Sequence, residues 1–277
     1  MDYDINKLHE VQLDLLKKFI KICGELKLTY YLVGGSALGA VKYKGFVPWD
    51  DDLDVAMPRG DYEKFLSEAE KHFEYPYFLQ NYRTDPEFPF LFSKLRNSET
   101  AFIEESWKNL KINHGIYIDI FPLDGYPEGK AGQLALDAEI VWYKTQLSIA
   151  RNKYRPVLTA RGRLEQLCYN TFGKHLSTAK IMKRYENTVK KYDPDKSGYF
   201  YNYGNKMHAV EKVPAEVYGS GARAEFEGLT VMIPERYDDF LRQRFGDYTE
   251  ELPEEKRVGS HIFSAVDTEK SYKLYIP

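Results

Sequence analysis

The sequence predicts a fold of the broad α/β class, which includes α+β arrangements. We expect a mixed-sheet core flanked by helices, followed by a mainly helical C-terminal part. Segments with helical periodicity alternate with short runs of β-branched and aromatic residues up to about residue 125. After that point, long helical patterns prevail. The chain has 277 residues, of which 43% are hydrophobic and 29% charged, an ordinary globular composition. We expect a catalytic core over residues 1–125 and a C-terminal region over residues 126–277 that completes the substrate site.

The first expected elements are a helix, a strand and a second, shorter helix. Residues 5–27 carry apolar side chains at helical spacing, which predicts an amphipathic helix. Thr29–Val33 reads "TYYLV", a β-rich run that predicts a strand ending at Gly34-Gly35. Residues 36–44 then have a helical pattern, with Ser36 near the N-cap.

The core is expected to continue with strands on either side of one helix. The run "LDVAM" predicts a strand that Pro58 ends, and Arg59–Phe73 has a helical pattern. Further strands are expected in the segments "YFLQNY", "FLFSKLR" and "GIYIDIFPL".

The C-terminal region is expected to begin with a linker and two helices. Asp124–Gly132 contains turn-forming residues, a long helix follows to about Asn152, and a second helix covers about Ala179–Lys191. The segment "RAEFEGLTVMIP" predicts a hairpin, and "ERYDDFLRQRF" predicts a helix that ends at Gly246.

Charge and cysteine usage exclude several classes of protein. The formal net charge of −3 gives no global sign of nucleic-acid binding. Cys23 and Cys168 offer no disulfide framework and no metal-binding spacing. The N-terminus lacks the pattern of a secretory signal, and no apolar stretch is long enough to span a membrane. We expect a cytoplasmic protein, with peripheral contact at the inner face of the cell membrane left open.

Four aspartates between Asp50 and Asp54 lie where the pattern predicts a buried strand. Because alternate residues of a strand share a face, Asp52 and Asp54 point away from Leu53 and lie about 6.5–7 Å apart. Aspartate is disfavoured in strands, and two carboxylates on one face repel each other unless a cation lies between them. The pair therefore predicts a site for Mg²⁺, with Mn²⁺ as an alternative.

Other acidic motifs share part of this pattern. The EF-hand calcium loop needs Gly at its sixth position, where this chain has Val55. A metal-dependent glycosyltransferase also uses two aspartates at this spacing and stays a rival. A phosphatase that forms an aspartyl-phosphate does so too, but it usually has Thr or Val where this chain has Ala56.

The sequence Gly34-Gly35-Ser36 precedes the acidic strand and separates these options. Glycines permit close approach of the backbone, and the start of the following helix offers free N–H groups to a phosphate. Alone, this stretch could be a plain strand-to-helix turn. Together with the acidic strand it predicts a phosphate-binding turn beside a metal site.

A third carboxylate and two cations are candidates for the same site. Asp119 is a lone charge within a strand whose isoleucines face the other way, although it could be a structural residue at a sheet edge. Lys94 and Arg96 share one face of a neighbouring strand and suit the binding of a diphosphate, unless they are surface charges.

The segment "GGSALGAVKYKGFVPWDDDLDVAM" resembles the signature of the LicD family of phosphocholine transferases, in the nucleotidyltransferase superfamily. The segments "SKLRNSETAF", "YIDIFPLDG" and "FGDYTEELPEEKR" are similar to further family blocks, so the resemblance covers roughly residues 25–260. The last block departs slightly, with Leu252-Pro253 in place of two prolines. The resemblance implies a nucleotidyltransferase-like core, with Asp52 and Asp54 as metal ligands and Asp119 as the third carboxylate.

The resemblance also implies a reaction, in which a phospho-alcohol moves from a CDP-activated donor to a hydroxyl of a glycan and CMP is released. Bacterial members use CDP-choline and act on sugars of teichoic acid or lipopolysaccharide, whereas the eukaryotic fukutin-type relatives use CDP-ribitol. The expected partners are therefore CDP-choline or another CDP-alcohol and a glycan or lipid-linked glycan acceptor. No nucleic-acid partner is expected.

A choline donor would need an aromatic site for its trimethylammonium group. Trp49, beside the acidic cluster, and tyrosines of "GYFYNYGNKMH" are candidates, with ordinary packing as the alternative. His261 and the Lys256-Arg257 pair either reach the substrates or belong to the solvated surface. Two other functions stay open at this point: a metal-dependent glycosyltransferase using a nucleotide sugar, and a non-catalytic glycan-binding protein.

Overall fold

The core of the protein is a five-stranded mixed sheet in the order β1-β2-β6-β4-β3. The computed structural model describes residues 3–150, 160–204 and 211–276. Strands β2 and β6 are parallel, and the other neighbouring pairs of this sheet are antiparallel. The predicted α/β class with a mixed sheet is therefore confirmed. The strands are β1 (Tyr31–Leu32), β2 (Asp54–Pro58), β3 (Tyr77–Gln80), β4 (Ser93–Asn97) and β6 (Ile116–Leu123).

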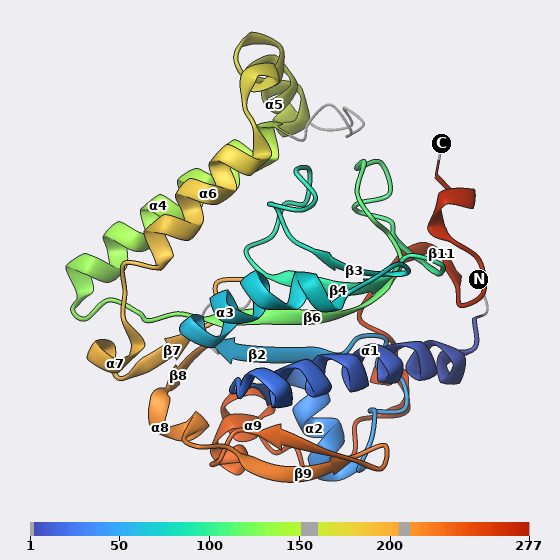
Figure 1. Ribbon diagram of the computed structural model, residues 1–277. Helices are drawn as coiled ribbons and strands as arrows, with labels where there is room; N and C mark the ends of the chain where they lie inside the picture. The colour runs from blue at the N-terminus through green and yellow to red at the C-terminus, as the bar shows by residue number, and fades with distance from the viewer. Residues whose placement is uncertain (1–2, 151–159, 205–210, 277) are drawn as a thin grey trace.

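Two helices cover one face of this sheet (Figure 1). Helix α1 (Ile5–Leu26), which begins at the N-cap Asp4, and helix α3 (Arg59–Ala69) both contact β6. Because side chains alternate along β6, Ile118 and Ile120 join the main core while Asp119 faces the other way. The apolar sides of both helices thus cover one face of the sheet. The polar residues of β6 point to the other face.

Segments from the C-terminal region pack beside β1 and complete the same body. Helix α2 (Gly34–Lys42) contacts strand β9 (Ala222–Phe226) and helix α9 (Tyr237–Phe245). Strand β10 (Leu229–Ile233) pairs with β9 as the predicted hairpin. These contacts bring α9 next to the glycine turn at the start of α2.

Helices α4 (Lys130–Ala150) and α6 (Thr178–Val189) lie side by side as an arm that extends from the sheet, with α5 (Ala160–Thr171) at its far end (Figure 1). The arm has its own apolar cluster, which includes Leu136, Ile140 and Met182. Helix α5 is an addition to the sequence-based expectation, and the expected end of α4 near Asn152 falls outside the described residues.

A second short ladder joins two segments that the sequence pattern did not reveal as strands. Strand β5 (Ala101–Glu104) pairs antiparallel with β11 (Phe263–Asp267), so residues near position 260 lie beside the core. None of the described helices is both long and apolar enough to cross a membrane. The remaining short elements are η1 (Glu70–His72), η3 (Gly173–His175), α7 (Pro194–Ser197), β7 (Tyr199–Tyr201), β8 (Lys212–Pro214), α8 (Ala215–Tyr218), η4 (Glu254–Lys256) and η5 (Tyr272–Leu274).

Candidate active site

Three neighbouring strands place charged side chains at the same level of the sheet. Asp54 on β2 and Lys94 on β4 both pair in register with Asp119 on the central strand β6. The Lys94 Nζ lies 2.8 Å from Asp119 Oδ1. Asp52 precedes β2, which begins at Asp54, and its carboxylate borders the same cavity. The structure therefore brings together the three aspartates that the sequence singled out.

The glycine turn packs directly against these carboxylates. Gly34 has a φ of +57°, and a Cβ at this position would lie 3.0 Å from Asp54 Oδ2. A Cβ on Gly35 would overlap a carboxylate oxygen of Asp50. The backbone N–H of Asp54 donates to Ser36 Oγ over 2.8 Å, which fixes the start of β2 on the turn. Small residues are needed here because the acidic cluster occupies the space that side chains would fill.

The carboxylates of the acidic cluster, Asp50, Asp52, Asp54 and Asp119, are only partly compensated by the nearby cations. Burial, together with the charge of Asp52, raises the pKa of Asp50 to about 9. Burial and the same charge raise the pKa of Asp54 well above its usual range. Burial also raises the pKa of Asp119, although Lys94 opposes this shift. Asp54 Oδ1 is buried and has no hydrogen-bond partner among the described residues. These carboxylates would gain most from a bound cation.

The donor set fits a hard divalent cation. Asp52, Asp54 and Asp119 offer only oxygen ligands, which Mg²⁺ and Mn²⁺ accept, and the unpaired Asp54 Oδ1 is an available ligand atom. A second group, Asp51, Asp52 and His261, has ligand atoms within 4.8 Å of one another. In that group Asp51 already accepts hydrogen bonds at both of its oxygens, so a cation there would have to displace them. The occupied oxygens of Asp51 and the unpaired Asp54 Oδ1, rather than the spacing of the ligand atoms, therefore favour the first set.

Asp51 holds a C-terminal segment against the site. Its Oδ1 lies 2.8 Å from His261 Nδ1 and accepts hydrogen bonds from the backbone N–H and the hydroxyl of Ser260. Burial works against a charge on His261, but the hydrogen bond that its Nδ1–H donates to Asp51 and the charge of Asp52 raise the pKa of His261 to about 9. His261, which the sequence left between a substrate contact and a solvated residue, lines the cavity as a cation.

Arg96 lies outside the cavity, which corrects its assignment as a phosphate ligand. The guanidinium is fully buried and donates hydrogen bonds to the side chain of Gln80 and to the carbonyl of Gly115. It also lies 4.7 Å from the ring centre of Tyr117. Lys94 and Arg96 share a strand face as predicted, but Nε and Nη1 of Arg96 donate to Gln80 and to the backbone away from the cavity. Arg96 therefore has a structural role.

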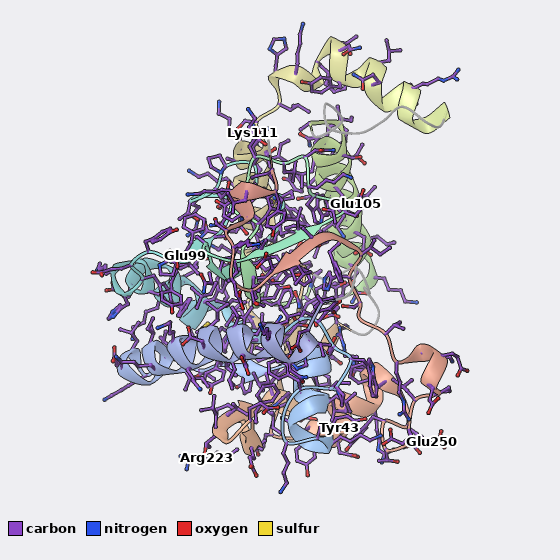
Figure 2. The ribbon with its side chains drawn as sticks, turned by 90° about the vertical axis from the view of Figure 1, so that its right-hand side faces the viewer. Tyr43, Glu99, Glu105, Lys111, Arg223 and Glu250 are labelled. Carbon is purple, nitrogen blue, oxygen red and sulfur yellow. The ribbon has the colours of Figure 1, made fainter. Side chains whose placement is uncertain are left out.

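Trp49 belongs to a different cavity from the acidic cluster. It lines a pocket with Tyr43, Tyr248 and Glu250, and the Arg257 guanidinium lies 5.2 Å from its ring centre. Figure 2 shows Tyr43 and Glu250 on neighbouring segments at this end of the molecule. The structure thus does not place Trp49 beside Asp52 and Asp54.

The cavity at the acidic cluster has a volume of about 310 Å³. Its lining combines the aspartates, Lys94 and Arg244 with the aromatic rings of Phe90, Phe92, Trp107 and Phe121. Arg244 on α9 lies 2.6 Å from Glu211 and interacts electrostatically with Asp54. The described lining residues that sequence reasoning did not single out are Phe90, Phe92, Glu104, Trp107, Phe121, Gly204, Arg244 and Ser260.

A sequence signal existed for some of these residues. Arg244 comes directly before the C-terminal segment "FGDYTEELPEEKR", and Phe92 and Phe121 lie next to Lys94 and Asp119 in the same strand segments. Phe90 begins the expected strand segment "FLFSKLR", at the alternate positions that Phe92 and Lys94 continue, whereas no periodicity marks Trp107. Both residues lie in loops.

Comparisons with known proteins agree with this geometry. Residues 27–161 match the family described as "LicD/FKTN/FKRP, nucleotidyltransferase domain". The chain is also 26% identical over 266 residues to the protein named "Lipopolysaccharide cholinephosphotransferase LicD" from Haemophilus influenzae. This similarity covers 92% of the chain and 95% of the relative. The matched domain contains the glycine turn, the acidic cluster, Lys94 and Asp119.

Proposed function

Because the chain belongs to the LicD family, we propose that it is a divalent-cation-dependent transferase for phosphocholine or a similar phospho-alcohol. The donor is a CDP-activated alcohol, the acceptor is a hydroxyl of a cell-surface glycan precursor, and the released nucleotide is CMP. The name of the Haemophilus influenzae relative supports choline as the alcohol and a lipopolysaccharide as the acceptor.

The observation that carries this proposal is the pairing of Asp54 with Asp119 on parallel strands, beside Lys94 and the glycine turn. Phosphoryl transfer needs charge stabilisation around the phosphorus more than covalent chemistry from the protein. A buried group of carboxylates flanked by cations meets this need.

The residues have separable roles in this proposal. Asp52, Asp54 and Asp119 hold Mg²⁺ or Mn²⁺, which when bound neutralises charge on the donor diphosphate. Lys94 and Arg244, which line the cavity together with the aspartates, contact phosphate oxygens, and His261 adds a third positive charge at the cavity wall. Gly34 and Gly35 let the carboxylates of Asp54 and Asp50 pack against the start of α2, whose N-cap makes no side-chain hydrogen bond among the described residues, so its first N–H groups can face the donor phosphates.

The acceptor hydroxyl must lose its proton as the new P–O bond forms. Asp119 is the carboxylate placed to take this proton, or it completes the metal site. Its ion pair with Lys94 favours the ionised form that either role requires.

The test is a search for the released nucleotide. The full chain is incubated with Mg²⁺ and, separately, with CDP-choline, CDP-ribitol, CDP-glycerol and UDP-sugars, in the presence of a lipopolysaccharide or lipid-linked glycan acceptor. We expect CMP from a CDP-alcohol and a phospho-alcohol on the glycan. Release of UDP from a sugar nucleotide would instead identify a glycosyltransferase, and no turnover with any donor would favour a glycan-binding protein.

An active-site variant connects this activity to the acidic cluster. Asp54→Asn removes one charge with little change in volume, and we expect it to lower CMP release by at least about 1,000-fold. A variant that keeps most of the activity would contradict the metal assignment.

A further inference from the structure

One wall of the active-site cavity is aromatic, and neither a metal nor a diphosphate accounts for it. The ring centres of Phe90 and Trp107 lie 5.0 Å apart, and those of Phe90 and Phe92 also lie 5.0 Å apart. Phe92 and Phe121 continue the row at 4.6 Å. All four rings line the same cavity as Asp52, Asp54 and Asp119.

The surrounding backbone holds these rings in place. The N–H of Trp107 donates to the carbonyl of Glu104 over 2.9 Å, in a loop whose neighbouring residues Glu105 and Lys111 are labelled in Figure 2. Phe90 packs against Phe88, which is fully buried in the main core. Phe90 and Trp107 are themselves only partly buried, so they present apolar surface to the cavity.

A carboxylate accompanies the two partly buried rings. Glu104 lines the cavity beside Trp107 and lies 3.9 Å from Lys94. Although burial opposes it, the positive charges of Lys94 and His261 lower the pKa of Glu104 and keep it ionised. Glu104 also accepts a hydrogen bond from the hydroxyl of Tyr117 over 3.3 Å, and its ionised carboxylate adds negative charge to this part of the cavity wall.

We propose that Phe90, Trp107 and Glu104 form the subsite for a quaternary ammonium group on the transferred alcohol. This inference rests on the proposed function, and it moves the expected aromatic site from Trp49 to the loops before β4 and after β5. A quaternary ammonium is weakly hydrated and is attracted to the faces of aromatic rings, and a nearby carboxylate adds to that attraction.

The same wall disfavours other alcohols. Ribitol and glycerol carry hydroxyl groups that would lose hydrogen bonds to water against phenylalanine and tryptophan rings. Ethanolamine carries a primary ammonium that is strongly hydrated and would need hydrogen-bond acceptors in their place. Phe90, Trp107 and Glu104 therefore determine which alcohol is preferred. They take no part in the transfer of the phosphate.

Binding of the alcohol phosphate alone tests the subsite without turnover. Ligand-observed NMR titrations of the full chain would measure the Kd of phosphocholine and of phosphoethanolamine. We expect the wild type to prefer phosphocholine, and Trp107→Leu or Phe90→Leu to weaken phosphocholine about tenfold while phosphoethanolamine changes less than about twofold. Trp107→Phe should restore most of the affinity, and Trp142→Leu on the exposed side of the arm is the matched control.

The outcomes separate this inference from the proposed function. Equal affinity of the wild type for both phosphates, or an equal loss of both in the variants, would overturn the subsite. Thermal unfolding of each variant shows whether it is folded. If one of the two leucine variants fails to fold, the other still tests the subsite. Turnover of CDP-choline by the wild type is measured independently: its absence would overturn the proposed transferase, whatever the phosphates show.

Discussion

Gly34 and Gly35 show how single residues decide whether the active site can form. Both contact the acidic cluster, and Gly34 also adopts a positive φ that L-residues rarely take. A side chain introduced at either glycine would therefore destabilise the protein by displacing a carboxylate. At Gly34 it would also strain the backbone.

We expect Gly34→Ala to lower the free energy of unfolding by about 1–3 kcal/mol, because alanine must adopt the strained conformation beside Asp54. Urea denaturation would measure this change. Gly60→Ala is the matched control, since Gly60 lies in α3 and a Cβ added there would meet nothing within 4 Å. Alanine there should leave stability unchanged or raise it by about 0.5–1 kcal/mol. Equal effects of the two substitutions would contradict the argument.

His114 predicts a pH dependence of stability. Burial and the charge of Arg96 lower the pKa of His114 to about 4 from an ordinary 6.5. Between these values the unfolded chain binds a proton that the folded protein does not, so the free energy of unfolding falls as pH decreases from about 6.5 towards 4, by up to about 3 kcal/mol. Denaturation curves of the wild type and of His114→Gln from pH 4.5 to 7 would measure it. The variant should show a shallower decrease, and parallel curves would refute this origin.

Strand periodicity was sufficient to group several residues of the site. Asp52, Asp54 and Asp119 each follow from local alternation, because a charge opposite a buried side chain must face away from the core. Periodicity also placed Lys94 and Arg96 on one face, but it could not tell which would reach the cavity. Arg96 was misassigned because its partners, Gln80 and Gly115, come from other segments that only the folded chain brings near.

Among the elements, the pairing of β5 with β11 has the largest effect on the site. It lies beside the point where Ser260 and His261 meet Asp51, so a segment distant in sequence becomes part of the cavity wall. The sequence predicted neither strand, because β5 is short and β11 is only half-buried and lacks clear alternation.

Asp51→Asn is expected to loosen this C-terminal segment. The amide removes the charge that pairs with His261, and we expect a loss of about 1–3 kcal/mol in the free energy of unfolding together with lower transferase activity. Thermal unfolding and CMP release would report the two effects.

Glu269→Gln serves as the control for Asp51→Asn, because Glu269 joins the same segment to Lys7 through an exposed ion pair of 3.0 Å. Exposed pairs contribute little, so its effect should stay below about 1 kcal/mol. A larger effect of Glu269→Gln than of Asp51→Asn would show that burial of the contact is unimportant.

The arm formed by α4 and α6 is anchored to the core by a buried ionic network. Arg59 of α3 lies 2.6 Å from Asp124 and 3.5 Å from Glu186 of α6. Helical periodicity predicted α4 and α6 but not how they are anchored to the core. A buried ion pair between distant segments produces no periodic pattern in the sequence. The division at residue 125 stays a prediction.

For the molecule as a whole, the acidic cluster predicts that a divalent cation is part of the stable fold. A ligand that binds only the folded state raises stability, by about 2.7 kcal/mol at a hundredfold excess over Kd. We expect Mg²⁺ at that excess to raise the Tm of the wild type by about 5–10 °C in thermal scans.

Asp54→Asn should lose this shift, and without Mg²⁺ it should unfold at the same temperature as the wild type or higher, because one of the repelling buried charges is gone. Asp137→Asn, on the exposed surface of α4, should behave like the wild type in both conditions. A Mg²⁺ shift that persists in Asp54→Asn would place the cation elsewhere.

The cavity at the acidic cluster joins Asp52 and Asp54, in the first quarter of the chain, to Arg244 and His261 in the last. During synthesis on the ribosome, the glycine turn and all of the acidic residues emerge long before these cations. A nascent chain therefore carries the aspartates and Lys94 before Arg244, and Asp51 is synthesised long before its partner His261. Under the proposed function, the donor site is therefore completed only when the last segment docks, and incomplete chains would bind the donor poorly.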